Sequence, residues 1–394
     1  MKNPVNFFNA ELVNNEWWFS NRNFNALMKM NSESGETEMV STFEGFPPEE
    51  ENLHIKTIRF DNLLVFIPFF KNIIHIWNIE KNCFEKSVTI DYEKSRNFIN
   101  AFKDDNDIIW IIPNRLSDAI ILFDIEKRKV SSFDGIKEVS ISENMGDVNL
   151  WIGSTNYQNN QIYIQANLTN VCYSVDCNTQ KIEKIVFSEN FPVVSAYPYE
   201  NKLYLSLLKT SDIFEYNIET KEYTRYEIDN EIKKEMHYCY YHIIRKENKL
   251  IVTPCYSDNI IIYDIEDRKY EKLIFPEGFE RTTVYSMCGF YKIKENGICV
   301  FPSGCNQFIK INTDDFTLST VPIILSDSLK NHSEDMINNI FEKKYHSEID
   351  ENFAYKETMD MFINKLVSEE TANKKNDETN AGEKIHNYIV SLFK

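Results

Sequence analysis

The residues of this chain best suited to chemistry lie in the run Met236-His237-Tyr238-Cys239-Tyr240-Tyr241-His242. Imidazole and phenol groups can transfer protons or hold polar ligands. Because side chains alternate along a strand, His237 and Tyr241 are expected on one face, and Tyr240 and His242 on the other. We therefore take His237, Tyr240 and His242 as candidate catalytic residues. Packing in the protein core is the alternative role for the same side chains.

Metal and cofactor sites are not predicted. A single strand supplies too few ligands for a metal ion. The sequence has no glycine-rich dinucleotide motif, phosphate loop, His-Glu-x-x-His, Gly-x-Ser-x-Gly or EF-hand loop. It contains only 10 glycines in 394 residues, whereas average usage is about 7%. These absences disfavour nucleotide-dependent enzymes, zinc hydrolases and serine hydrolases.

A second group of candidates is suited to ligand binding. Polar and aromatic residues recur on strands that we expect to line a central channel, namely His54, Asn100, Asn149, Trp151, Tyr197 and Tyr285. Amide, phenol, indole and imidazole groups suit sugars, peptides or planar polar ligands. Arg22 and Arg115 lie in nearby loops, where an arginine fork can hold a carboxylate. The alternative for the arginines is an ordinary solvated loop position.

These candidates must be positioned by a repeated β unit. An Asp or Asn closes a short apolar run seven times, at intervals of 41 to 52 residues, at Asn31, Asn78, Asp124, Asp176, Asn217, Asp264 and Asn312. Such a period is typical of the four-stranded blades of β-propellers. An Asp or Asn side chain can accept hydrogen bonds from the backbone two residues on, which suits a turn. Pro68, Pro113, Pro254 and Pro302 lie where the second strand must end.

The repeat predicts an all-β fold, a seven-bladed β-propeller of four-stranded antiparallel blades with a C-terminal α-helical extension. The predicted propeller spans 3–323, with blades at about 3–46, 53–90, 97–135, 146–187, 192–228, 236–276 and 283–323. The extension spans 325–394 and includes a polar linker at 368–382. We expect blades 1 and 7 to join directly, with the helices bracing that seam.

Residues 3–323 resemble the kelch and WD40 propeller superfamilies in blade architecture. The paired glycines that kelch repeats imply are absent, as are the Gly-His and Trp-Asp dipeptides of WD40 repeats. Streptogramin lyase-like propellers share the seven-blade count. Their metal and histidine constellation has no recognisable counterpart here, so the resemblance assigns no catalytic residue.

Charge and hydropathy limit the partners. The formal net charge is −18, which argues against a general nucleic-acid binder. No stretch is apolar enough for a membrane helix and the start lacks a signal-peptide core, so we expect a soluble cytoplasmic protein without membrane contact. A terminal amphipathic stripe at 383–393 must bury its apolar face. It would dock on the protein's own propeller or on a second subunit.

Two classes of function remain. The preferred one is a propeller binding protein that recognises a peptide, glycan or protein partner through the face around its central channel. The alternative is a propeller enzyme, such as a lyase, isomerase or peptide- or glycan-modifying enzyme, with a channel site built from His and Tyr. The fold does not choose between them, because propellers support many functions.

Overall fold

The fold is seen in a computed structural model that describes residues 5–91, 97–145, 148–150, 152–187, 192–228, 240–254, 259–275, 290–294, 297–302, 306–327 and 329–331. The chain forms two compact units, Met1–Ser333 and Glu334–Lys394. All of the described residues belong to the first unit. The predicted helices of the C-terminal extension lie outside the described residues.

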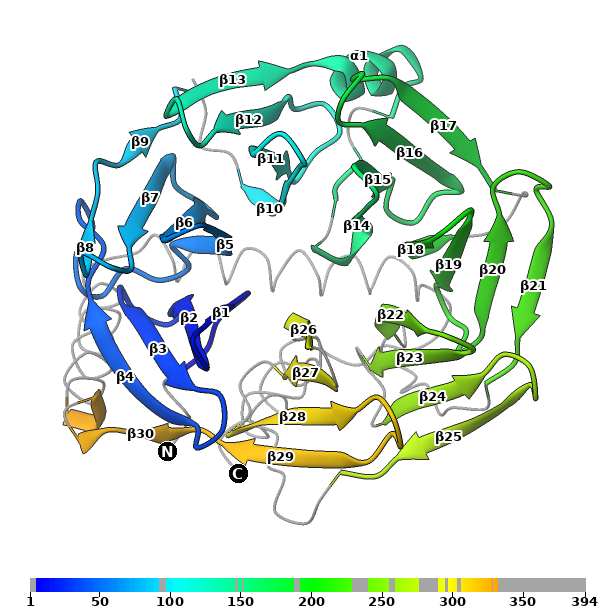
Figure 1. The fold of residues 1–394 in the computed structure, drawn as a ribbon. Helices are drawn as coiled ribbons and strands as arrows, with labels where there is room; N and C mark the ends of the chain where they lie inside the picture. The colour runs from blue at the N-terminus through cyan, green and yellow to red at the C-terminus, as the bar shows by residue number, and fades with distance from the viewer. Residues whose placement is uncertain are drawn as a thin grey trace, which may run out of the picture. The chain divides into compact units, whose positions relative to one another are not determined.

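Seven sheets arranged in a ring form the first unit (Figure 1). Consecutive strands pair within each sheet, five sheets have four strands, and two have five. The first strand of each blade lies nearest the centre of the ring and the later strands lie toward its rim (Figure 1). The prediction of an all-β, seven-bladed propeller is confirmed, with blades that are mostly four-stranded and antiparallel.

The strands follow one another around the ring. Blades 1 and 2 contain β1 (Glu11–Val13), β2 (Glu16–Ser20), β3 (Leu27–Asn31), β4 (Glu36–Ser41) and β30 (Ile324–Leu325), then β5 (His54–Phe60), β6 (Leu63–Pro68), β7 (Ile73–Asn78), β8 (Cys83–Phe84) and β9 (Val88–Thr89). Blades 3 and 4 contain β10 (Phe98–Lys103), β11 (Ile108–Pro113), β12 (Ile120–Asp124) and β13 (Lys129–Phe133), then β14 (Thr155–Gln158), β15 (Gln161–Gln165), β16 (Val171–Asp176) and β17 (Ile182–Val186).

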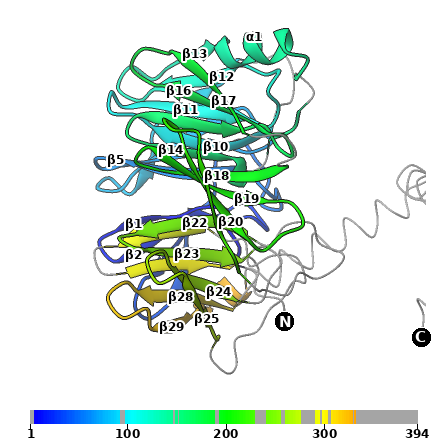
Figure 2. The ribbon, with the colours of Figure 1, turned by 90° about the vertical axis from the view of Figure 1, so that its right-hand side faces the viewer.

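Blades 5, 6 and 7 each have four strands. They contain β18 (Val193–Tyr199), β19 (Lys202–Leu207), β20 (Ile213–Asn217) and β21 (Tyr223–Tyr226), then β22 (Tyr240–Lys246), β23 (Lys249–Pro254), β24 (Ile260–Asp264) and β25 (Lys269–Leu273), then β26 (Phe290–Lys294), β27 (Gly297–Phe301), β28 (Gln307–Asn312) and β29 (Leu318–Pro322). Helix α1 (Gly135–Ser142) lies at the rim between blades 3 and 4 (Figures 1 and 2), and a short 3-10 helix spans Ile152–Ser154. In the described part of the chain, no helix has the length and apolar character needed to span a bilayer.

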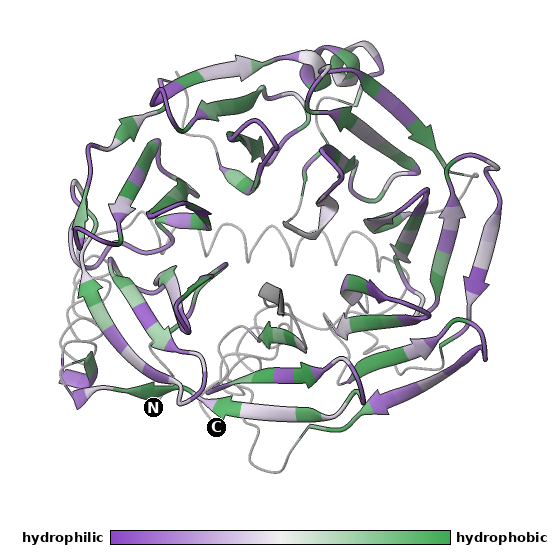
Figure 3. Cartoon of the chain, in the orientation of Figure 1, coloured by the Kyte–Doolittle hydropathy of each residue, from purple (hydrophilic) through white to green (hydrophobic). Residues whose placement is uncertain are grey.

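The core lies between neighbouring blades. The second strands are buried along almost their whole length, as in β6 and β11, because adjacent blades cover both of their faces. Val65 and Ile67 of blade 2 pack in one cluster with Ile109 and Ile111 of blade 3. Figure 3 shows hydrophilic segments on outer strands such as β21 and β25. Each fully buried aliphatic side chain stabilises the fold by about 1.5–3 kcal/mol, so the blades depend on contact with one another.

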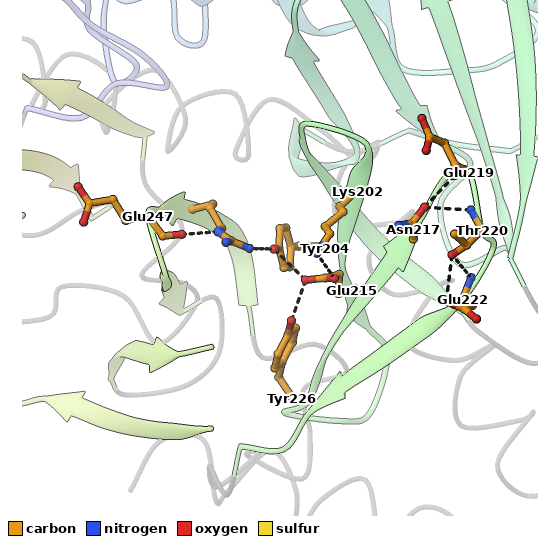
Figure 4. A network of polar contacts seen from close by, with 10 residues as sticks. Lys202, Tyr204, Glu215, Asn217, Glu219, Thr220, Glu222, Tyr226 and Glu247 are labelled. Atoms are coloured by element: carbon orange, nitrogen blue, oxygen red, sulfur yellow. Dashed lines mark hydrogen bonds and ion pairs between the residues drawn. The ribbon is translucent and has the colours of Figure 1, made fainter. Parts of the chain in front are cut away.

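The seven anchor residues shape the turns after the third strands, as predicted. Each side-chain oxygen accepts a hydrogen bond from a backbone N–H two or three residues further on. Asn217 Oδ1, for example, accepts from the N–H groups of Glu219 at 2.9 Å and Thr220 at 3.0 Å (Figure 4). Pro68, Pro113 and Pro254 end their second strands, which is also as predicted.

The ring closes through a strand from the end of blade 7. β30 pairs in parallel with β4 and becomes the fifth strand of blade 1. The N–H of Ile324 donates to the carbonyl of Gly35 at 2.9 Å, and the N–H of Ser326 donates to that of Thr37 at 3.1 Å. The expectation of a direct junction without a crossing strand was therefore wrong, because a strand of two residues leaves no periodic pattern in the sequence.

Glycine is required where the closing segment passes β4. Gly35 has φ +74°, and a Cβ atom there would lie 1.8 Å from the carbonyl oxygen of Pro322. Gly45 has a similar φ of +85°, but the nearest atom to a Cβ there would be 3.9 Å away. A substitution at Gly45 therefore measures the cost of the backbone conformation alone. A substitution at Gly35 measures that cost together with the clash against the closing segment.

We predict that Gly35→Ala lowers the free energy of unfolding by about 3 kcal/mol or more, because left-handed strain of about 1–2 kcal/mol is added to a clash. Gly45→Ala should lower it by about 1–2 kcal/mol from strain alone. Urea unfolding of both purified variants measures the difference. Equal losses in the two variants would show that contact with the closing segment contributes nothing.

Candidate functional site

The connections between strands emerge on two sides of the ring. We define the loop face as the side that carries the connections between second and third strands and those between consecutive blades. Six large hydrophobic side chains are exposed among the described residues, and five lie on the loop face or at strand ends that reach it, namely Phe70, Ile141, Leu168, Val186 and Ile274. Scattered exposed apolar residues are ordinary, so it is their concentration on one side that favours this face for binding.

Two predicted ligand residues, Arg115 and Asn149, meet on the loop face. They lie opposite each other in an isolated antiparallel bridge, framed by the N–H of Leu150, which donates to the carbonyl of Asn114 at 2.7 Å. Helix α1 supports this bridge, because Ser140 Oγ donates to the carbonyl of Leu116 at 3.0 Å.

Both of these side chains are exposed, and the structure gives neither a hydrogen bond nor an ion pair within the described part of the chain. Directly opposed residues have Cβ atoms about 5 Å apart. The backbone thus brings a residue that carries a guanidinium next to one that carries a carboxamide, and these two groups suit a carboxylate or sugar hydroxyls. Arg115 and Asn149 form the accessible polar part of the candidate site.

Arg22 is also on the loop face but is half-buried. Its Nε donates to Asn52 Oδ1 at 2.9 Å, and its guanidinium lies 4.1 Å from the ring centroid of Phe8. Burial lowers the pKa of Arg22, while the charge of Glu51 acts in the opposite direction. Arg22 therefore has a structural role, because it attaches the connection 42–53 to blade 1.

The inner wall of the channel is held together by polar ties between blades. Asn100 of blade 3 accepts a hydrogen bond from Lys56 Nζ of blade 2 at 3.0 Å and donates to Thr155 Oγ1 of blade 4 at 3.0 Å. Asn156 Nδ2 of blade 4 donates to the carbonyl of Ala196 in blade 5 at 2.8 Å. Asn100 is 8% exposed. This predicted ligand residue therefore links three blades.

Four inner strands share an irregularity in register at or near their candidate residues. The register shifts between His54 and Lys56, Phe98 and Asn100, Val193 and Ser195, and Tyr240 and His242. Such a bulge re-aims side chains relative to simple alternation. Tyr240 and His242 are accordingly unlike in burial, since Tyr240 is fully buried and His242 is half-buried.

His54 belongs to a buried hydrogen-bond chain that we call the histidine relay, made of Ser20, His54, His75 and the Glu44 carbonyl. His75 Nε2 lies 3.0 Å from the Glu44 carbonyl, which can only accept, so Nε2 carries the hydrogen. In neutral His75, Nδ1 must then accept from His54 Nε2 at 3.0 Å. His54 Nδ1 accepts in turn from Ser20 Oγ at 2.8 Å.

The relay lies between blades 1 and 2 and away from solvent. Ser20 and His54 are each 5% exposed and His75 is 1% exposed. Sequence reasoning missed Ser20 and His75 as partners of His54. The available signal was a histidine in the otherwise apolar run Ile73-Ile74-His75-Ile76-Trp77.

The remaining predicted residues are not brought into one site. His237, Trp151 and Tyr285 lie outside the described residues. The carbonyl of Tyr240 accepts from Ser206 Oγ at 3.1 Å, and its side chain joins a core cluster that also contains Tyr204 and Tyr226. Tyr197 of β18 is half-buried against the same cluster. No group of three or more potential metal ligands occurs in the described part of the chain.

A buried carboxylate in blade 5, Glu215, was also missed. Glu215 is 7% exposed, and its carboxylate accepts hydrogen bonds from the hydroxyls of Tyr204 at 2.9 Å and Tyr226 at 2.7 Å, with Lys202 Nζ at 2.6 Å (Figure 4). Burial alone would raise the pKa of Glu215, but these donors lower it overall. Arg245 of blade 6 donates to the Tyr204 hydroxyl, so the network joins the two blades.

Comparison with known proteins establishes the fold class. No protein-family model and no curated protein matches the sequence. Virginiamycin B lyase from Staphylococcus aureus is similar in structure, with 12% identity, coverage of 78% of this chain and 95% of that chain, and a TM-score of 0.55. A streptogramin B lyase structure matches with 15% identity, coverage of 77% and 92%, and a TM-score of 0.54. A chain of the mitotic checkpoint complex matches with 10% identity, coverage of 83% and 89%, and a TM-score of 0.50.

The chain is thus a seven-bladed β-propeller that shares its architecture with virginiamycin B lyase and with WD40-type propellers. At such low identities the similarity concerns the fold alone.

We predict that two asparagines proposed for ligand binding differ in their structural contribution. Asn100→Ala should lower the free energy of unfolding by about 2–3 kcal/mol, because it removes hydrogen bonds to the buried Thr155 of blade 4 and to the half-buried Lys56 of blade 2. Asn149→Ala removes the same atoms from an exposed position and should change it by less than about 0.5 kcal/mol. Urea unfolding of both variants tests this, and similar effects would contradict the assignment of Asn100 as an inter-blade tie.

Proposed function

We propose that this protein is a propeller binding protein that recognises a peptide, glycan or protein partner through the loop face around its channel. The main support is the contrast between two sets of polar residues. Asn100, Lys56 and His54 hydrogen-bond to groups of the protein itself. Arg115 and Asn149 lie exposed on the loop face, and five of the six exposed large hydrophobic side chains among the described residues lie on this face or at strand ends that reach it.

The alternative is a propeller enzyme that uses His237, Tyr240 and His242. The fold is compatible with this alternative, because a virginiamycin B lyase shares it. The local geometry supports it less, since the side chain of Tyr240 is fully buried in a core cluster. We therefore retain binding as the proposed function.

The proposal is tested by selecting ligands for the full-length protein from a random peptide library displayed on phage and from a glycan array. We predict that Arg115→Ala weakens binding of the selected ligand at least tenfold, which is the loss of about 1.4 kcal/mol or more expected for a central arginine. Leu168→Asn should weaken it similarly, because Leu168 is an exposed apolar residue of the same face. Isothermal titration calorimetry measures both.

Arg268→Ala is the matched control, because Arg268 is exposed on the turn between β24 and β25, on the opposite side of the ring. Its affinity should stay within twofold of the wild type. Equal weakening by Arg115→Ala and Arg268→Ala, or no effect of either loop-face variant, would refute binding through this face.

A further inference from the structure

The histidine relay ends on the connection between blades 1 and 2, at residues 42–53. His75 Nε2 donates to the Glu44 carbonyl in this connection. Asn25 Nδ2 donates to the carbonyls of Phe43 and Phe46, which flank Glu44. At its other end, Asn52 accepts the hydrogen bond from Arg22. The connection is thus attached to blade 2 through the relay and to blade 1 through Asn25 and Arg22.

Aromatic residues enclose the two imidazoles. The ring centroid of Phe43 lies 4.3 Å from that of His54 and 5.2 Å from that of His75. Phe66 of β6 packs on His54, while Phe84 of β8 and Phe46 pack on His75. Ser20 of β2 is likewise uncharged. The only carboxylate that acts on the pair within the described part of the chain is that of Glu44.

The relay has room for one additional proton at most. A proton on His75 Nδ1 reverses the chain, because His54 Nε2 must then accept and His54 Nδ1 must donate to Ser20 Oγ. A second proton would place two N–H donors and two cations against each other, at the 3.0 Å separation of His54 Nε2 and His75 Nδ1. Nothing between these nitrogens screens that repulsion, since both side chains are buried.

Burial also opposes protonation. Burial and then the neighbouring His75 hold the pKa of His54 well below its ordinary value. Burial lowers the pKa of His75, although the Glu44 carbonyl and carboxylate partly offset that effect. Because both folded-state pKa values are depressed, the relay is neutral and intact above the unfolded value of about 6.5. Its contribution to stability falls as the pH drops from about 6.5 through the folded-state pKa values.

We propose that the histidine relay is an acid-sensitive latch that holds the connection 42–53 against blades 1 and 2. Under acid, the repulsion is relieved when His75 moves toward solvent, which displaces the segment containing Phe43, Glu44 and Phe46 that covers it. Asn52 belongs to the same connection and holds Arg22 on the loop face. Opening the latch therefore alters the loop face, a consequence that rests on the proposed function.

Hydrogen–deuterium exchange of the full-length protein at pH 7.5 and pH 5.0, corrected for intrinsic exchange rates, tests the latch without a ligand. The protection factors of peptides that cover 42–53 should be at least tenfold lower at pH 5.0 than at pH 7.5. Peptides that cover 114–118, in the connection bridged to Asn149, should lose less than twofold. Equal protection of 42–53 at both pH values would overturn the proposal.

Variants identify the titrating groups. His54→Asn with His75→Gln replaces both imidazoles with amides that can donate and accept but cannot titrate in this range. This double variant should keep its protection at pH 5.0, whereas the control His386→Gln, which also removes a histidine, should lose protection as the wild type does. Loss of protection in the double variant equal to that of the wild type would overturn the latch. If the double variant does not fold, His75→Gln alone should at least halve the loss, and an unchanged loss would overturn it.

A selected ligand then tests the consequence for binding. Its affinity should fall at least fivefold between pH 7.5 and pH 5.0 for the wild type and stay within twofold for the double variant. An exchange response without any change in ligand affinity would overturn control of the loop face by the latch. Failure to select a ligand bears only on the proposed function, since the exchange measurement does not use one.

Discussion

Every blade of this ring needs a neighbour on each side, and the rest of the structure depends on that constraint. The second strands are buried along almost their whole length by contacts with adjacent blades. A sheet with two apolar faces gains its stability only when both faces are covered. The closing strand β30 completes this arrangement by adding to blade 1, and Gly35 permits the close approach that the addition requires.

The same constraint explains why polar residues on the inner wall are poor indicators of function. Where blades meet near the channel, backbone groups without partners would destabilise the fold, so side chains such as Asn100, Asn156 and Ser206 bond across the junctions. Some loop residues, such as Arg22 and Asn25, make similar ties, whereas the side chains of Arg115 and Asn149 make none within the described part of the chain. The distinction assigns Asn100 to the scaffold and leaves Arg115 and Asn149 available on the surface.

Local patterns made the blade architecture predictable from the sequence, whereas contacts between blades were not. The anchor at Asn217 and the strand end at Pro254 depend on residues within two or three positions, so their roles could be read directly. The candidate site depends on longer-range relations. The pairing of Arg115 with Asn149 and of Ser20 with His54 joins separate segments. The shift between Tyr240 and His242 also breaks the alternation on which the sequence-based face assignment relied.

The parallel pairing of β30 with β4 has a consequence for how the chain folds during synthesis. Gly35 and Ile324 are hydrogen-bonded although about 290 residues separate them. Closing so long a loop carries an entropic cost, and the contacts that compensate for this cost form only when the ring is closed. Blade 1 emerges first from the ribosome but receives its last strand only after blade 7 has been made. Until then, apolar surfaces at the open ends of the ring remain exposed to aggregation, which makes the final step of assembly the one most in need of protection in the cell.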